Sequence, residues 1–87
     1  MGVYNIFFKA SVRKDLARLS SVDLRRVMDR IAALAAEPRG PGCEKLSGLE
    51  HYRIRQGRYC ILYSIQDAEL TVWVIKVAQR KDVYRTL

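Results

Sequence analysis

The chain has 87 residues, which is room for one hydrophobic core, and 49% of them are hydrophobic, which excludes a disordered chain. Lys and Arg number 16 against 9 Asp and Glu, and the net charge of +7 favours polyanionic partners such as nucleic acid or an acidic protein. No apolar run could span a bilayer, and the opening run, residues 3–8, lacks the basic lead-in of a secretory signal. We therefore expect a cytoplasmic protein without a membrane partner, in which Cys43 and Cys60 are free thiols.

The first segment, VYNIFFK at residues 3–9, is rich in aromatic and β-branched residues and predicts a strand. Helical spacing follows, and Ser11 is the expected N-cap. One face of this predicted helix carries Val12, Leu16 and Leu19.

A second helix is predicted after a very short turn. Ser20 with Asp23 resembles a capping box, and Pro38 is expected to end the helix. Its apolar stripe consists of Leu24, Val27, Met28, Ile31, Leu34 and Ala35. The two stripes predict an antiparallel helical pair.

The second half of the chain is predicted to be a small sheet. Residues 38–44 hold two prolines and two glycines and indicate a loop. Gln56 and Gly57 are expected to form a tight turn, and the run 70–77 is expected to be the central strand. The strand-like segments are roughly 45–56, 58–65 and 69–77. This order of elements predicts an α+β fold, in which both helices cover one face of the sheet and the other face is at least partly open.

Alternation along the strands predicts which side chains face the helices, because successive residues point to opposite faces. One apolar set comprises Tyr52, Ile54, Tyr59, Ile61, Tyr63 and Ile65. Arg53, Arg55 and Arg58 fall on the opposite face, and Cys60 is expected among them. Arginine offers a planar fork of donors that suits phosphate, so this face is a candidate RNA-binding surface as well as an ordinary solvated one.

Metal and nucleophile chemistry find little support in the sequence. A single histidine, His51, excludes a two-histidine acid–base nuclease and a multi-histidine zinc site. No glycine-rich phosphate loop is present, and the cysteines have no base close in sequence. We expect neither a metal nor a cofactor.

Two stretches carry a resemblance to a known family. KLSGLEHYRIRQGRYCILYSI at 45–65, followed by VWVIKVAQRKDVYR at 72–85, resembles the RelE/ParE superfamily of toxins from type II toxin–antitoxin systems. The similarity runs nearly end to end, so the resemblance implies one RelE-like domain over residues 1–87. It implies two N-terminal helices packed on one face of a small, mainly antiparallel sheet.

The resemblance to RelE-type toxins also implies an activity and a set of residues. RelE-type toxins are metal-independent, ribosome-dependent mRNA endoribonucleases that inhibit translation. The catalytic positions of that type fall here on Arg53, Arg55, Arg80 and Tyr84. One further arginine position is occupied by Cys60, and Gln79 stands where a histidine is usual.

Roles follow from the chemistry of these side chains. Arg80 is expected to stabilise charge on the phosphate, and Tyr84 to act as a base or to orient the nucleophile. RNA or ribosome binding is expected of Arg53, Arg55, Arg58, Lys81 and Arg85. The implied partners are the ribosome, mRNA and an acidic RelB-like antitoxin, and the toxin alone is expected to be a monomer.

Two alternatives stay open at this point. A ParE-like protein keeps the same fold but inhibits DNA gyrase without being an enzyme. A weakly active member of the superfamily would mainly bind its antitoxin or RNA. Arg80 with Tyr84 favours mRNA cleavage, whereas Cys60 favours the alternatives.

Overall fold

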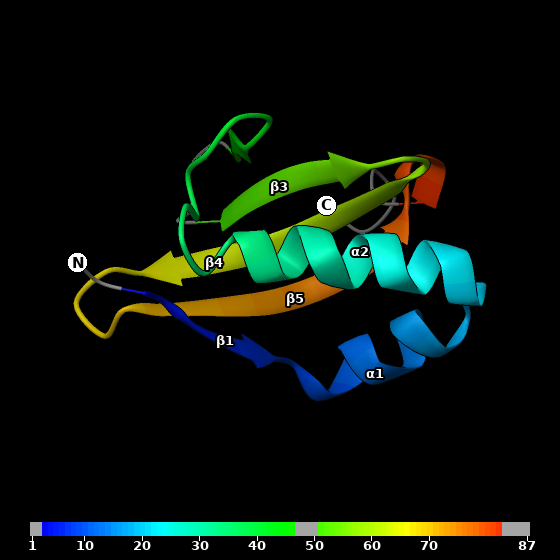
Figure 1. The fold of residues 1–87 in the computed structure, drawn as a ribbon, viewed down its shortest axis with the longest axis horizontal. Coiled ribbons are helices and arrows are strands. Elements are labelled where there is room, and N and C mark those ends of the chain that lie inside the picture. The colour runs from blue at the N-terminus through cyan, green and yellow to red at the C-terminus, as the bar shows by residue number, and fades with distance from the viewer. Residues whose placement is uncertain (1–2, 47–50, 83–87) are drawn as a thin grey trace.

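The computed structural model describes residues 3–46 and 51–82, which form a five-stranded sheet with two helices on one face (Figure 1). The strand order is β1-β5-β4-β3-β2, and only the β1–β5 pair is parallel. This confirms the predicted α+β class. The elements are β1 (Asn5–Phe8), α1 (Ala10–Ala17), α2 (Ser21–Ala33), β2 (Glu44–Lys45), β3 (His51–Gln56), β4 (Tyr59–Gln66) and β5 (Thr71–Gln79).

The central strand is β4, so the expectation that residues 70–77 form the centre of the sheet is wrong. β5 lies between β4 and β1 instead. A run of β-branched and aromatic residues indicates that a strand is buried, and both strands are, but it does not specify their order. In β4 the residues from Cys60 to Ile65 are buried on both faces of the sheet.

The helix boundaries follow local hydrogen bonding. α1 begins at Ala10 directly after the sheet, because the Lys9 amide still donates to the Val74 carbonyl at 3.0 Å, so the predicted Ser11 N-cap is wrong. Ser20 does cap α2, since its hydroxyl accepts a hydrogen bond from the Asp23 amide at 3.2 Å.

α2 ends at Ala33, before the predicted stop at Pro38. The amides of Leu34 and Ala35 each bond to a carbonyl three residues earlier, which tightens the chain and ends the α-helix. None of the helices in the described part of the chain is long and apolar enough to cross a membrane.

The core lies between the helices and the sheet, and it confirms the predicted alternation. Its buried members are Val12, Val27, Ile31, Leu34, Tyr52, Ile54, Ile61, Tyr63, Ile65, Val72, Val74 and Val77, with Tyr59 packed at its edge. Met28, predicted for the apolar stripe of α2, is instead 37% exposed.

The β3–β4 loop consists of Gly57 and Arg58, one residue later than the predicted turn. Gly57 has φ +59°, and glycine at the first position of a two-residue loop is typical of a type II′ turn.

Candidate functional site

Arg53 and Arg55 lie on β3 and point away from the helices, because Tyr52 and Ile54, their neighbours along the strand, are buried in the core. Arg55 is exposed, and it stands directly opposite Cys60 on β4. Cys60 in turn stands opposite a small residue of β5, Ala78.

Arg53 is part of an ion pair that the sequence analysis missed. Its guanidinium donates to a carboxylate oxygen of Glu44 at 2.8 Å, because β2 pairs with β3 and places the two residues opposite each other. Hydrogen bonding to Arg53, followed by its charge and that of Arg55, lowers the pKa of Glu44. The Arg53 side chain is only 18% exposed, so it is held in one orientation rather than extended into solvent.

Arg58 does not share the face of Arg55. It belongs to the two-residue loop, where the alternation of a strand does not apply, and its guanidinium lies 3.8 Å from the Asp23 carboxylate at the start of α2. The side chain is 71% exposed, so this ion pair is weak. The expectation from parity that Arg58 stands beside Cys60 is therefore wrong.

Cys60 is 1% exposed, so the expectation of a thiol on an open face among arginines is also wrong. It forms a second, small apolar cluster with Leu62, on the side of the sheet away from the helices. The packing around it comes from Leu46, which follows β2, and from Ile75 and Ala78 of β5. A buried thiol here fills space between two strands.

Arg80 follows β5 and is brought to the β3–β4 loop by a backbone hydrogen bond. Its amide donates to the Arg58 carbonyl at 2.8 Å. An open pocket of about 420 Å³ is lined by Arg58, Gln79, Arg80 and Lys81. We call Arg55, Arg58, Arg80 and Lys81 the basic cluster. The other predicted residues, Tyr84 and Arg85, lie outside the described residues.

The end of β5 that carries Arg80 is fixed by α1. β1 pairs with β5 only from Thr71 to Val74, so within residues 3–46 and 51–82 no strand lies beside the edge of β5 beyond that point. There the Val77 amide donates to the Asp15 carboxylate at 3.2 Å, and the ammonium of Lys76 lies 3.6 Å from the same carboxylate. A β-bulge opposite Leu62 and Tyr63 shifts the pairing register of β5, and so sets which side chains of this part of β5 face the helices.

A polar network lies at the opposite end of the sheet, near the β4–β5 turn. Arg39 binds Asp67 through two hydrogen bonds of 2.9 Å, and Tyr4 donates to the same carboxylate at 2.7 Å. The hydrogen bonds from Arg39, and to a smaller extent the one from Tyr4, lower the pKa of Asp67 to about 2. Arg39 also donates to the Tyr52 hydroxyl at 3.1 Å. The network ties the segment before β1 and the loop after α2 to the sheet.

Within residues 3–46 and 51–82, no three His, Cys, Asp or Glu side chains gather closely enough to hold a metal ion.

Burial is the main cause of the raised pKa of Tyr63, whose hydroxyl donates to the Pro38 carbonyl at 2.7 Å in the core. This tyrosine serves the structure rather than the candidate site.

Comparison with known proteins decides the family. The family model described as the ParE toxin of the type II toxin–antitoxin system parDE matches residues 6–84. The chain belongs to the ParE toxin family. It is a RelE-like toxin of a type II toxin–antitoxin system, within the RelE/ParE superfamily that the sequence resembles.

Individual relatives of this ParE-family chain include RelE-type toxins. Toxin RelG of Mycobacterium tuberculosis is 33% identical over 86 residues, which cover 94% of this chain and 97% of RelG. The toxin–antitoxin complex RelBE2 of the same organism contains a chain with a TM-score of 0.78 and 27% identity, over 90% of this chain and 99% of that one. The archaeal RelE–RelB complex of Pyrococcus horikoshii gives a TM-score of 0.81 and 26% identity, over 90% and 96% of the two chains.

Proposed function

We propose that this toxin is a ribosome-dependent mRNA endoribonuclease that inhibits translation. The observation that carries the proposal is the link between the Arg80 amide and the Arg58 carbonyl, which holds Arg80 beside the β3–β4 loop. In the register of the sheet Arg55 stands opposite Cys60, and Cys60 stands opposite Ala78, two residues before Arg80. The basic cluster thus combines arginines that are far apart in sequence on one end of the sheet.

The proposed reaction is attack of the 2′-hydroxyl on the adjacent phosphorus with departure of the 5′-oxygen. Negative charge grows on the phosphoryl oxygens during this reaction, and fixed guanidinium donors stabilise it. We assign this task to Arg80 and Arg55. Arginine has a pKa above about 12 and is a poor proton carrier, so a base or orienting role is assigned to Tyr84.

Arg53 has a different place in the proposal. Because Glu44 already accepts its hydrogen bonds, part of its charge is compensated in the free toxin. We assign Arg53 to RNA and ribosome binding, together with Arg58, Lys81 and Arg85. The cytoplasm is the compartment in which these partners are found.

The cleavage rate on programmed ribosomes tests the assignment. Arg80→Ala should reduce the rate about 100-fold, since loss of one charge-stabilising donor typically removes that much. Arg55→Ala should reduce it similarly, and Arg53→Ala less. The matched control is Arg25→Ala, which removes an exposed arginine from α2 and should leave the rate unchanged. Equal rates for wild type, Arg80→Ala and Arg55→Ala would remove the basis of the proposal.

A second candidate function is inhibition of DNA gyrase without catalysis. The observation that favours it is Cys60, which is buried and uncharged where RelE-type toxins carry an arginine. A supercoiling assay with purified gyrase distinguishes the two. Inhibition that persists in Arg80→Ala, together with intact mRNA, would favour this second function.

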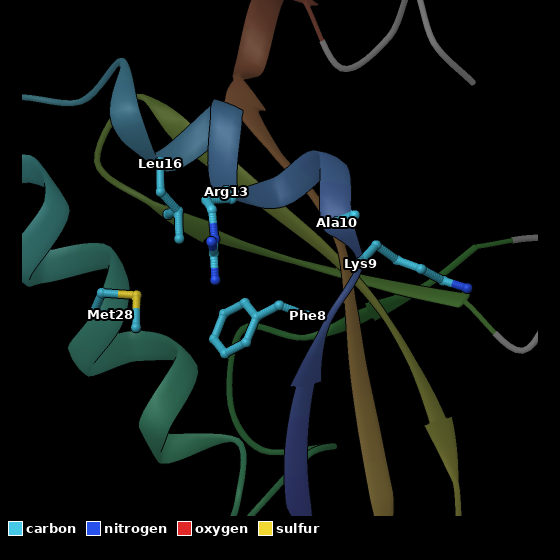
Figure 2. A pocket seen from close by; sticks show the side chains of 6 residues that line it. All are labelled: Phe8, Lys9, Ala10, Arg13, Leu16 and Met28. Atoms are coloured by element: carbon cyan, nitrogen blue, oxygen red, sulfur yellow. The ribbon is translucent and has the colours of Figure 1, made fainter.

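We also propose that an acidic antitoxin covers the helical face. A pocket of about 420 Å³ lies where α1 and α2 meet the end of β1, and its lining is Phe8, Lys9, Ala10, Arg13, Leu16 and Met28. Figure 2 shows Arg13 extending from α1 into the space between Phe8 and Leu16, with Met28 across from them. Exposed apolar side chains beside a cation suit an amphipathic acidic segment, and the structural neighbours include complexes with RelB.

A negative charge introduced into this pocket tests the surface. Met28→Asp should weaken binding of the antitoxin that co-purifies from the neighbouring reading frame at least about tenfold, because a carboxylate would replace an apolar contact and repel acidic residues. The control is Val22→Asp, an exposed position on the same helix outside the pocket. Equal binding by both variants would show that the antitoxin does not occupy this pocket. The lack of any co-purifying protein would contradict the proposal of an antitoxin partner.

A further inference from the structure

A row of side chains crosses the sheet on the face away from the helices, at the end of β3 opposite to Arg55. Phe7 of β1 stands opposite Trp73 of β5, Trp73 opposite Ser64 of β4, and Ser64 opposite His51 of β3. Residues that pair in a sheet point to the same side, so these four form one continuous strip. We call Phe7, Trp73, Ser64 and His51 the aromatic row.

The row contains an aromatic surface that is open to a ligand. The rings of Phe7 and Trp73 are 5.1 Å apart at an interplanar angle of 30°, and Phe7 is 46% exposed. A pocket of about 380 Å³ lies over the row and is lined by Lys9, His51, Ser64, Gln66, Trp73 and Ile75. It offers an indole face together with an imidazole and the Gln66 amide, whose nitrogen donates to the buried Ser64 hydroxyl at 3.3 Å. Imidazole and amide groups can bond to the edge of a nucleobase.

An aromatic surface beside a cation favours a nucleic acid over an acidic protein segment at this row, because bases stack on the ring. The ammonium of Lys9 lies 5.2 Å from the centre of the Trp73 ring, which is a weak contact for an exposed lysine. A base can take that position on the ring while the ammonium binds the adjoining phosphate. Stacking on aromatic side chains beside cations is the general mode by which single strands bind to proteins.

The row also lies on a continuous path from the basic cluster. His51 and Arg55 are four positions apart along β3, and Cys60 and Ser64 are four positions apart along β4. At a rise of about 3.3 Å per residue the path is ~13 Å long, a distance that a few nucleotides of one strand can span. Arg53 lies between the two ends.

We propose that the aromatic row is a nucleobase-stacking site, at which Trp73 holds a base of the same RNA strand whose phosphate contacts the basic cluster. This inference rests on the proposed function, which supplies RNA as the substrate. It adds a contact that gives the bound strand a direction along the sheet. It also makes Trp73 a determinant of affinity rather than of the chemical step.

Binding of a 2′-O-methylated, fluorescein-labelled RNA octanucleotide tests the site without any cleavage. Trp73 is the only tryptophan of the chain, so its fluorescence should be quenched as a base stacks on it. In anisotropy titrations, Trp73→Leu should weaken binding about 5- to 100-fold, the range for loss of one stacked base. Trp73→Phe should retain most of the affinity, and Val22→Ala, on the helical side, all of it.

Salt dependence separates this contact from the phosphate contacts. Arg80→Ala should lower the slope of log affinity against log salt by about 0.7, whereas Trp73→Leu should lower affinity with the slope unchanged. Unquenched Trp73 in the wild-type protein with saturating RNA would overturn the proposal, whether or not Trp73→Leu folds. Quenching by the co-purified antitoxin but not by the RNA would overturn it too and assign the row to a protein interface. A toxin that binds and quenches as expected but cuts no mRNA would refute the proposed function while leaving the stacking site intact.

Discussion

Asp15 should contribute more to the stability of this toxin than any surface carboxylate of its helices. Its side chain is 12% exposed and accepts the hydrogen bond of the Val77 amide at the unpaired edge of β5. In Asp15→Ala this buried amide loses its partner, which costs about 1–3 kcal/mol. Loss of the ion pair with Lys76, which is 33% exposed, adds at most about 1 kcal/mol.

The expected loss is therefore about 2–3 kcal/mol in the free energy of unfolding. For a domain of this size, 1 kcal/mol corresponds to a shift of about 4–8 °C in Tm, so Asp15→Ala should melt about 8–24 °C lower than wild type. Asp15→Asn keeps an acceptor oxygen and should lose less. Urea unfolding followed by circular dichroism gives the free energies, and hydrogen exchange should show faster opening at the Val77 amide.

Asp29 provides the matched control, because it is an exposed aspartate on α2. Asp29→Ala should change stability by less than about 0.5 kcal/mol. If Asp15→Ala unfolds at the same urea concentration as Asp29→Ala, the Val77 amide does not depend on Asp15. The account of how α1 fixes the strand that carries Arg80 would then be wrong.

Three further predictions concern the rest of the fold. The pKa of Asp67 is about 2 against an ordinary value of 3.8, and in Arg39→Ala it should rise toward 3.8, which NMR titration of the carboxyl measures. The stabilisation from the lowered pKa is complete above the ordinary pKa and disappears as pH falls through about 2, which acid unfolding measures. An unshifted carboxyl in the wild type would contradict the two hydrogen bonds from Arg39. Gly57→Ala should lower stability by about 1–2 kcal/mol in urea unfolding, because alanine at φ +59° is strained although no atom lies near its Cβ, and unchanged stability would exclude that backbone conformation. Cys60→Ser should cost about 1–3 kcal/mol, since a hydroxyl would replace a thiol that is 1% exposed, and a neutral effect would contradict its burial.

The faces of β3 and β4 could be predicted from the sequence because alternation is a local property. Ile54, Ile61 and Tyr63 needed no knowledge of their partners to be assigned to the core. The helical pair likewise followed from the spacing of apolar residues, and Ser20 from the chemistry of caps. These features depend on residues a few positions apart.

What could not be predicted depends on contacts between distant segments. The pair of Arg53 with Glu44 exists only because β2 joins the sheet beside β3. The burial of Cys60 requires neighbours from distant parts of the chain, such as Leu46 after β2 and Ala78 of β5. For Arg58, two residues of loop are enough to end the alternation and turn the side chain toward the helices.

The candidate site shows the same division. Its arginines were chosen from a resemblance and a pattern, and their catalytic roles stay predictions. The structure adds the backbone bond that brings Arg80 to Arg58, which no local pattern contains. The aromatic row was missed for the same reason, since Phe7 and Trp73 become neighbours only through the parallel pairing of β1 with β5.

The most direct test of the central claim is primer extension on mRNA in a translating extract with added toxin. We predict cuts at codon spacing that require ribosomes, that weaken about 100-fold with Arg80→Ala, and that are unchanged with Arg25→Ala. Intact mRNA at toxin concentrations that stop gyrase from supercoiling DNA would contradict it.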